Sequence, residues 1–177
     1  MQRSELEHVI RASGDIAKDN EIVVIGSQSI LGQFPNAPIR LLASMEMDVY
    51  PKNKPALANK IDGAIGEGSL FHERNGYYAQ GVGPETAVLP GGWQGRLIEV
   101  NNANTNGVSG LCLEVHDLTI SKLVASRAKD LEFVQELVRQ EMVKQATLTS
   151  RLADTQISES EQERIKSRIA SLFPRSD

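Results

Sequence analysis

The sequence predicts an α+β (α/β) domain in which helices flank a mixed β-sheet. Two observations predict this class: short apolar or β-branched runs alternate with amphipathic segments up to residue 116, and a mainly helical pattern follows. A chain of 177 residues with 40% hydrophobic residues is long enough to bury a sizeable core. We therefore expect a core over residues 1–116 and a helical C-terminal part, residues 117–177, that packs on it.

The first 116 residues are expected to alternate helices and strands. Ser4-Glu5-Leu6-Glu7 is a capping-box pattern ahead of an apolar stripe, which predicts the first helix. Residues 21–25 are β-branched and apolar, which predicts a buried strand. In order, the expected elements are a helix to about residue 19, a strand at 21–25, the start of a helix at 28–32, a strand at about 44–50, a helix at 55–65, and strands at 77–80, 87–89, 97–100 and 111–115.

The last third of the chain is expected to be helical. Asp117 is a good N-cap for one long helix that runs to about Gln145. Residues 147–160 are polar and are expected to link it to a last helix, capped by Ser158 or Ser160 and ending near Phe173-Pro174. That last helix either docks on the domain, exchanges with a second protomer or binds a partner, and we expect docking.

Composition excludes several classes of function. The sequence has no run of about twenty apolar residues and its N-terminus is charged, so we expect a cytoplasmic protein without a membrane partner. The lone Cys112 has no cysteine to pair with and is expected to be a core residue. The net charge of −4 gives no overall attraction to nucleic acid. A polyanionic partner would need a local basic patch, for which the candidates are Arg74, Arg96, Lys122, Arg127 and Lys129.

Two carboxylates stand out on the strand expected near residue 46. Glu46 and Asp48 alternate with Met47 and Val49, so both carboxylates project from one side of the strand while the apolar side chains pack into the core. Adjacent carboxylates repel each other unless they face open water or share a cation, and paired oxygen ligands suit Mg²⁺. Both a solvent-exposed sheet face and a metal site are open interpretations of the pair alone.

The preceding turn favours the metal site. Gly26 and Ser27 lie between a buried strand and a helical pattern. Backbone N–H groups and a small hydroxyl in such a turn can approach a phosphate closely. The turn and the acidic pair together therefore indicate a site for a phosphate-bearing ligand and a divalent cation.

These two segments resemble a known signature. Val24-Ile25-Gly26-Ser27 followed by Glu46-Met47-Asp48-Val49 resembles the motif of the nucleotidyltransferase fold shared by polymerase-beta-like enzymes. Residues 116–134 are similar to a helix of small prokaryotic stand-alone members, in which Asp-Leu, Ser-Lys-Leu, Arg and Lys-Asp recur. Those members are similar to abortive-infection and MenT-type toxins of toxin–antitoxin pairs. The resemblance covers roughly residues 5–140 and implies a minimal nucleotidyltransferase fold.

The resemblance implies a reaction. A nucleoside monophosphate would move from an NTP to an acceptor hydroxyl on a tRNA, a protein or a small molecule, with release of pyrophosphate. It implies that Glu46 and Asp48 hold Mg²⁺ (or Mn²⁺) and that Gly26 and Ser27 hold the nucleotide phosphates. Glu99 is the best positional match to a third metal-binding carboxylate, or else an ordinary exposed strand residue.

The resemblance also implies site residues in the helical part. Lys122 and Asp130 fall where toxin-like members have a catalytic lysine and a later aspartate. Arg127 lies within the apolar stripe of the expected long helix, where a cation needs an explanation. It either snorkels or pairs with an internal carboxylate, such as Asp130 or Asp117, or it meets a phosphate of the nucleotide or the catalytic acids.

Two classes of function stay open. The first is an active nucleotidyltransferase, with a toxin role and an antitoxin protein as partner among its implications. The second is a binding module of the same fold that has lost transfer activity and acts through a protein partner. Magnesium-dependent nucleotide binding that is lost on Asp48→Ala would favour the first class.

Overall fold

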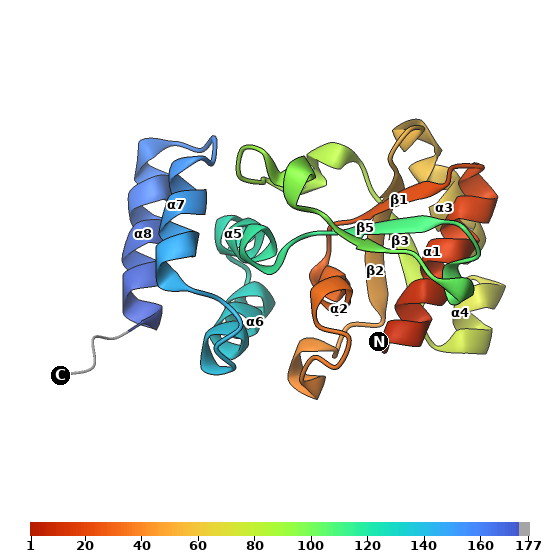
Figure 1. Cartoon of the computed structure of the whole chain (residues 1–177), viewed down its shortest axis with the longest axis horizontal. Helices are drawn as coiled ribbons and strands as arrows, with labels where there is room; N and C mark the ends of the chain where they lie inside the picture. The colour runs from red at the N-terminus through yellow and green to blue at the C-terminus, as the bar shows by residue number, and fades with distance from the viewer. Residues whose placement is uncertain (174–177) are drawn as a thin grey trace. The chain divides into compact units, whose positions relative to one another are not determined.

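The computed structural model describes residues 1–173 (Figure 1). The chain divides into two compact units. The first unit comprises residues 1–86 and 96–114, and the second comprises residues 87–95 and the chain from Val115 onward. Each unit has its own set of packed elements.

A mixed sheet of five strands forms the centre of the first unit (Figure 1). The order across the sheet is β3-β2-β1-β5-β4. Strand β1 runs antiparallel to β2 and parallel to β5, while β2 and β3 are parallel and β4 and β5 are antiparallel. The predicted α+β class with a mixed sheet is confirmed. The strands are β1 (Glu21–Val24), β2 (Glu46–Pro51), β3 (Tyr78–Gly81), β4 (Ile98–Val100) and β5 (Ser109–Cys112).

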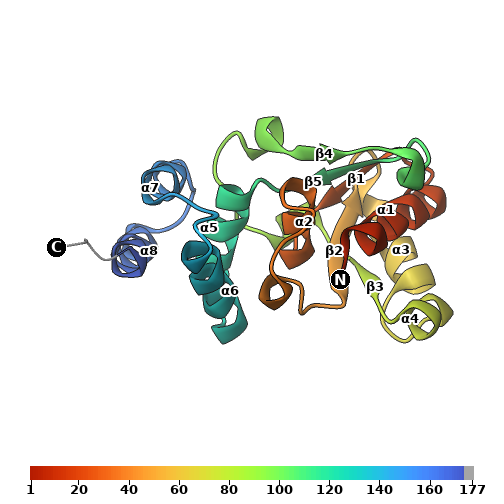
Figure 2. The same ribbon diagram turned by 60° about the horizontal axis from the view of Figure 1, so that its bottom comes forward.

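Helices cover one face of this sheet. In the first unit, α1 and α3 lie together beside the strands (Figure 2). Ile10 of α1 lies against Gly110 of β5, and the backbone of Ala58 in α3 lies against Gly81 of β3. Strand residues alternate between the two faces of the sheet. The residues that pair with Gly81 and Gly110 on neighbouring strands therefore point to the same helices. The helices of this unit are α1 (Arg3–Ala17), α2 (Ile30–Gln33), α3 (Ala58–Ile65) and α4 (Leu70–Asn75).

The alternation along β2 sorts its side chains as predicted. Met47 and Val49 are fully buried, and Val49 pairs with Gly81 on the helix-covered face. Glu46 and Asp48, with intermediate exposure, therefore project from the opposite face. Burial of Met47 and Val49 thus fixes the direction of both carboxylates.

The second unit contains four α-helices in its described part. Helix α5 packs on α6 and α7, and α7 packs on α8 (Figure 1). Ser158 caps α8 and forms a capping box with Glu161, which confirms the predicted last helix and its cap. Pro174, at the predicted end of that helix, lies outside the described residues. The four helices are α5 (Val115–Ala125), α6 (Ala128–Arg139), α7 (Gln145–Ala153) and α8 (Glu159–Leu172).

The prediction of one long helix from Asp117 to about Gln145 was wrong. Ser126 adopts a left-handed backbone conformation with φ 58°, and its N–H donates to the carbonyl of Lys122, which ends α5. Arg127 then begins α6 as its N-cap. Asp117 lies inside α5 rather than capping it, and its buried carboxylate pairs with Arg151 of α7 at 3.2 Å.

Several smaller predictions also needed correction. The first helix is capped by Gln2 with Glu5, two residues earlier than the predicted Ser4 and Glu7. Residues 87–89 form no strand and belong to the second unit. Helix α7 lies where a polar linker was expected, and α4 was not predicted. Cys112 is buried, as predicted. Within the described residues, no helix is both long enough and apolar enough to span a bilayer.

The close approach of α3 to β3 predicts opposite effects for two glycine substitutions. A Cβ atom at Gly81 would overlap the backbone carbonyl of Ala58, which cannot move aside alone. Gly81→Ala should therefore lower the free energy of unfolding by about 1–3 kcal/mol, as overpacking does. Gly63→Ala, in α3, meets nothing within 4 Å and should raise it by about 0.5–1 kcal/mol through helix propensity. Urea unfolding measures both, and equal effects would contradict the packing.

Candidate functional site

The first cluster of site residues forms where β1 ends beside β2. Val24 pairs with Val49, and the N–H of Ile25 donates to the backbone carbonyl of Asp48 at 3.1 Å. Because of this antiparallel register, the residues that follow β1 lie beside Asp48. The predicted turn, Gly26-Ser27, therefore lies next to one of the two predicted carboxylates.

Gly26 is in direct contact with that carboxylate. A Cβ atom at position 26 would overlap Oδ2 of Asp48, so a residue with a side chain fits only if the carboxylate moves. Ser27 begins a short 3-10 helix, Ser27–Ser29, that leads into α2. The structure thus brings Gly26, Ser27 and Asp48 together.

Strand β3 supplies hydrogen-bond donors to Glu46. Tyr78 lies opposite Glu46 in the parallel β2–β3 pair, and its hydroxyl donates to Oε2 of Glu46 at 3.1 Å. In the amide orientation that matches donors to acceptors, the side-chain nitrogen of Gln80 donates to Oε1 and Oε2 of Glu46 at 3.3 and 3.1 Å. Glu46, Asp48, Tyr78 and Gln80 share one face of the sheet because paired and alternate strand residues point the same way.

Tyr78 stays protonated at neutral pH. Its burial, followed by the charge and hydrogen bond of Glu46 and the charges of Glu67 and Asp48, raises the pKa of Tyr78 to about 12. The hydroxyl therefore acts as a donor to the carboxylate over the whole physiological range. The ring of His72 from α4 lies 4.6 Å from the ring of Tyr78, and its Nδ1 accepts the N–H of Gly68 at 3.0 Å.

Sequence reasoning missed the role of Tyr78 and Gln80. The signal that could have found them is their spacing: residues 78 and 80 share a face of β3, as 46 and 48 share a face of β2. Using that signal requires knowing that β3 pairs with β2 in this register, which the local sequence does not contain. The register therefore adds two residues to the candidate site.

The structure does not bring Glu99 to the acidic pair. Glu99 lies on β4, and both β1 and β5 stand between β4 and β2 in the sheet. Three strand spacings amount to roughly 14 Å. The carboxylate of Glu99 instead accepts a hydrogen bond from the Ser109 hydroxyl at 2.6 Å. Within residues 1–173, no three His, Cys, Asp or Glu side chains gather into a group that could hold a metal ion.

A second cluster forms in the second unit, around Asp130. Its carboxylate is almost completely buried, with 1% side-chain exposure, and accepts from Nε and Nη2 of Arg127 at 2.6 and 3.2 Å. Nζ of Lys122 lies 3.1 Å from the same carboxylate. The structure therefore brings the three predicted residues Lys122, Arg127 and Asp130 together, and it confirms that Arg127 pairs with an internal carboxylate.

The break between α5 and α6 creates this cluster. Asp130 lies in the first turn of α6, where its carboxylate also accepts the backbone N–H of Arg127 at 3.3 Å. Burial acts to raise the pKa of Asp130, but the hydrogen bonds and charges of Arg127 and Lys122 outweigh it and hold the pKa below its ordinary value. Asp130 is thus an ionised anchor for two cations. The side chain of Arg127 is 60% exposed, so its guanidinium is also accessible from solvent.

A comparison with protein families identifies the chain. The model of a family described as "Nucleotidyltransferase of unknown function (DUF6036)" matches residues 4–172, which is nearly the whole sequence, and the chain belongs to this family. No curated protein matches the chain, and no solved structure matches it. The family match agrees with the nucleotidyltransferase resemblance of the motifs around Gly26 and Glu46, but it names no substrate.

The ion pairs of Asp130 predict a pH-dependent stability. Because its folded pKa lies below the ordinary value of 3.8, the stabilisation is fully present above that value and is lost as the pH falls through the folded pKa. At neutral pH, Asp130→Asn should cost about 2–4 kcal/mol, since it leaves two cations without their buried partner. The difference between wild type and variant should shrink below about pH 4.

Urea unfolding from pH 7 to pH 3 measures this difference. The control is Glu132→Gln, which neutralises an exposed carboxylate on the same helix and should change stability by less than about 0.5 kcal/mol. An Asp130→Asn cost that stays constant down to pH 3 would contradict the ion-pair explanation.

Proposed function

From the membership of this chain in a nucleotidyltransferase family, we propose that it transfers a nucleoside monophosphate from an NTP to an acceptor hydroxyl and releases pyrophosphate. The observation that supports the proposal most directly is the contact of Gly26 with Asp48. Gly26 has no side chain, so its turn is suited to a phosphate. The contact places this turn next to Asp48, one of the two carboxylates that share a face of the sheet.

The donor set fits a divalent cation. Glu46 and Asp48 offer carboxylate oxygens, which are hard ligands, from the same face of β2. Mg²⁺ is usually bound by one or two protein carboxylates together with substrate phosphates, so a third carboxylate such as Glu99 is not required. We propose that Glu46 and Asp48 hold Mg²⁺ or Mn²⁺. When bound, the ion would neutralise phosphate charge and make the acceptor hydroxyl more acidic.

The remaining residues of the first unit would position the reactants. Tyr78 and Gln80 hold the carboxylate of Glu46 in one orientation through three donor contacts. The backbone of Gly26 and the hydroxyl of Ser27 would hold the nucleotide phosphates, because small residues let a phosphate approach the main chain closely. Ser27 is partly exposed, which leaves its hydroxyl accessible.

The cluster in the second unit has, by itself, side chains suited to a phosphate. The exposed guanidinium of Arg127 is suited to a phosphate, since its fork of donors matches phosphate oxygens. Asp130 would orient Arg127 and Lys122 rather than serve as a general base, because its lowered pKa makes it a weak base and its oxygens are engaged by the two cations. A catalytic role of Lys122 stays a prediction from the resemblance. The acceptor class, a toxin role and an antitoxin partner stay predictions from the resemblance.

Removing the charge of Asp48 tests the function. Wild type is incubated with each α-labelled NTP, Mg²⁺ and total cellular RNA, and label transfer to RNA or protein is followed by gel. Asp48→Asn should reduce transfer by about 10³-fold or more, because a metal ligand supports several kcal/mol of transition-state stabilisation. It should also weaken Mn²⁺ binding, measured by electron paramagnetic resonance. Asp15→Asn, an exposed position on α1, is the matched control.

Two outcomes would contradict the proposal. Transfer by Asp48→Asn at the wild-type rate would exclude the acidic pair from the chemistry. No transfer and no pyrophosphate release by folded wild type with any NTP would support the binding-module class instead.

The hydroxyl of Tyr78 predicts a second, smaller effect. Tyr78→Phe keeps the ring that contacts His72 and removes only the donor to Glu46. Activity and Mn²⁺ affinity should fall by about 10–100-fold, the usual cost of losing a group that orients a metal ligand. Tyr77→Phe removes the neighbouring hydroxyl, which bonds Nδ1 of His8 at 2.8 Å, and should leave both quantities unchanged. Equal losses in the two variants would show that Tyr78 acts only on folding.

A further inference from the structure

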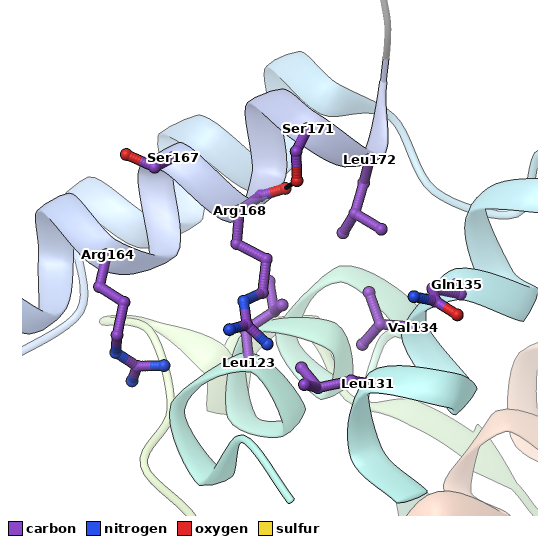
Figure 3. Close-up of a pocket in the computed structure, with 9 residues that line it drawn as sticks. All are labelled: Leu123, Leu131, Val134, Gln135, Arg164, Ser167, Arg168, Ser171 and Leu172. Atoms are coloured by element: carbon purple, nitrogen blue, oxygen red, sulfur yellow. Dashed lines mark hydrogen bonds between the residues drawn. The ribbon is translucent and has the colours of Figure 1, made fainter. Parts of the chain in front are cut away.

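A crevice in the second unit lies between α8 and the helices α5 and α6. It has a volume of about 450 Å³, within the range of ligand-binding pockets. Figure 3 shows its side chains reaching from the three helices. The lining is Leu123 of α5, Leu131, Val134 and Gln135 of α6, and Arg164, Ser167, Arg168, Ser171 and Leu172 of α8.

The crevice is apolar at its floor and cationic along one wall. Leu123, Leu131 and Val134 form the floor, and Arg164 and Arg168 extend toward it from α8 (Figure 3). None of the nine lining residues is acidic. Two cations therefore stand over an apolar floor that contains no opposite charge.

The two arginines differ in what they contact. Nη1 of Arg164 donates to the hydroxyl of Ser126 at 2.7 Å. The guanidinium of Arg168 makes no hydrogen bond or ion pair to any of residues 1–173, although its side chain is only partly exposed. On another face of the same helix, Lys166 lies 3.4 Å from the carboxylate of Glu163. Of these three cations, Arg168 is thus the one without a partner within residues 1–173, while the charge of Arg164 also acts on Glu161 of the same helix.

The spacing of these cations indicates what they would bind. Arg164 and Arg168 are one turn apart on one face of α8, about 6 Å along the helix axis. The lining of α8 from Arg164 to Leu172 extends over about 12 Å, or two helical turns. Two acidic side chains at positions i and i+4 of another helix have the same spacing as the arginines. An apolar residue between them would meet the floor.

We propose that this crevice binds an amphipathic helix of a partner protein, with two carboxylates placed on Arg164 and Arg168 and an apolar side chain on Leu123 and Leu131. Charge complementarity indicates the class of occupant. A partly buried arginine forms its strongest hydrogen bonds with a carboxylate, and the apolar face of the same partner helix would exclude water from that ion pair. The inference does not depend on the transfer activity.

A designed helix tests the proposal. The probe is a fluorescein-labelled, alanine-rich peptide of roughly 18 residues, long enough to be partly helical, with leucines at i, i+3 and i+7 and glutamates one turn apart beside them. Fluorescence anisotropy measures its affinity for the full chain. Arg168→Glu should weaken binding by about tenfold or more. Lys166→Glu makes the same change of charge on the same helix outside the crevice and should leave the affinity unchanged.

A charge swap makes the test specific. The double variant Arg164→Glu/Arg168→Glu should bind a peptide with lysines in place of the glutamates more tightly than the original peptide, while wild type shows the reverse preference. Thermal unfolding of each variant checks that it folds. Equal affinity for Arg168→Glu and Lys166→Glu, or no binding by wild type at millimolar peptide, would overturn the proposal. So would a wild-type dimer in sedimentation that Arg168→Glu dissociates, because the occupant would then be a second copy of this chain.

Discussion

The candidate site depends on one contact, the passage of the main chain at Gly26 against the carboxylate of Asp48. This contact exists because β1 and β2 pair antiparallel with Val24 opposite Val49. A slip of one residue in that register would turn Asp48 into the core and Val49 out of it, so burial of the apolar side chains fixes the face from which the carboxylate projects. Core packing and the chemistry of the site are therefore set by the same pairing.

The second constraint is the parallel pairing of β2 with β3. It places Tyr78 opposite Glu46, and it leaves each of the two carboxylates with a different environment. Glu46 receives donors from Tyr78 and Gln80, whereas Asp48 is enclosed on one side by the main chain at Gly26. Two carboxylates with the same intrinsic chemistry are thus held by different means, and each can be perturbed separately.

The sequence predicted the parts of this site that depend on local pattern, and missed those that depend on pairing between distant segments. The turn at Gly26 and the alternation around Asp48 are visible within a few residues, and the fold class follows from the alternation of elements. The place of Glu99 depends on strand order, which no local pattern contains. The break at Ser126 was missed because a serine there is compatible with a helix, and it is the reach of Asp130 back to Arg127 that stabilises the new N-terminus.

Electrostatics explains why we pair Glu46 and Asp48 with a divalent cation in the proposed site. The chain has a net charge of −4, and under the proposed function a nucleoside triphosphate would bring further negative charge to the face that already carries Glu46 and Asp48. At physiological ionic strength, charges more than about 8–10 Å apart are largely screened, so the groups near the ligand decide the local potential. Around Glu46, Tyr78 and Gln80 are neutral donors that orient the carboxylate without neutralising it, and the negative charges of Asp48 and Glu67 also act on Tyr78. Under the proposed function, a divalent cation held by Glu46 and Asp48 would reconcile the two carboxylates with a polyphosphate, and nucleotide affinity would then follow the occupancy of the cation rather than the net charge of the protein.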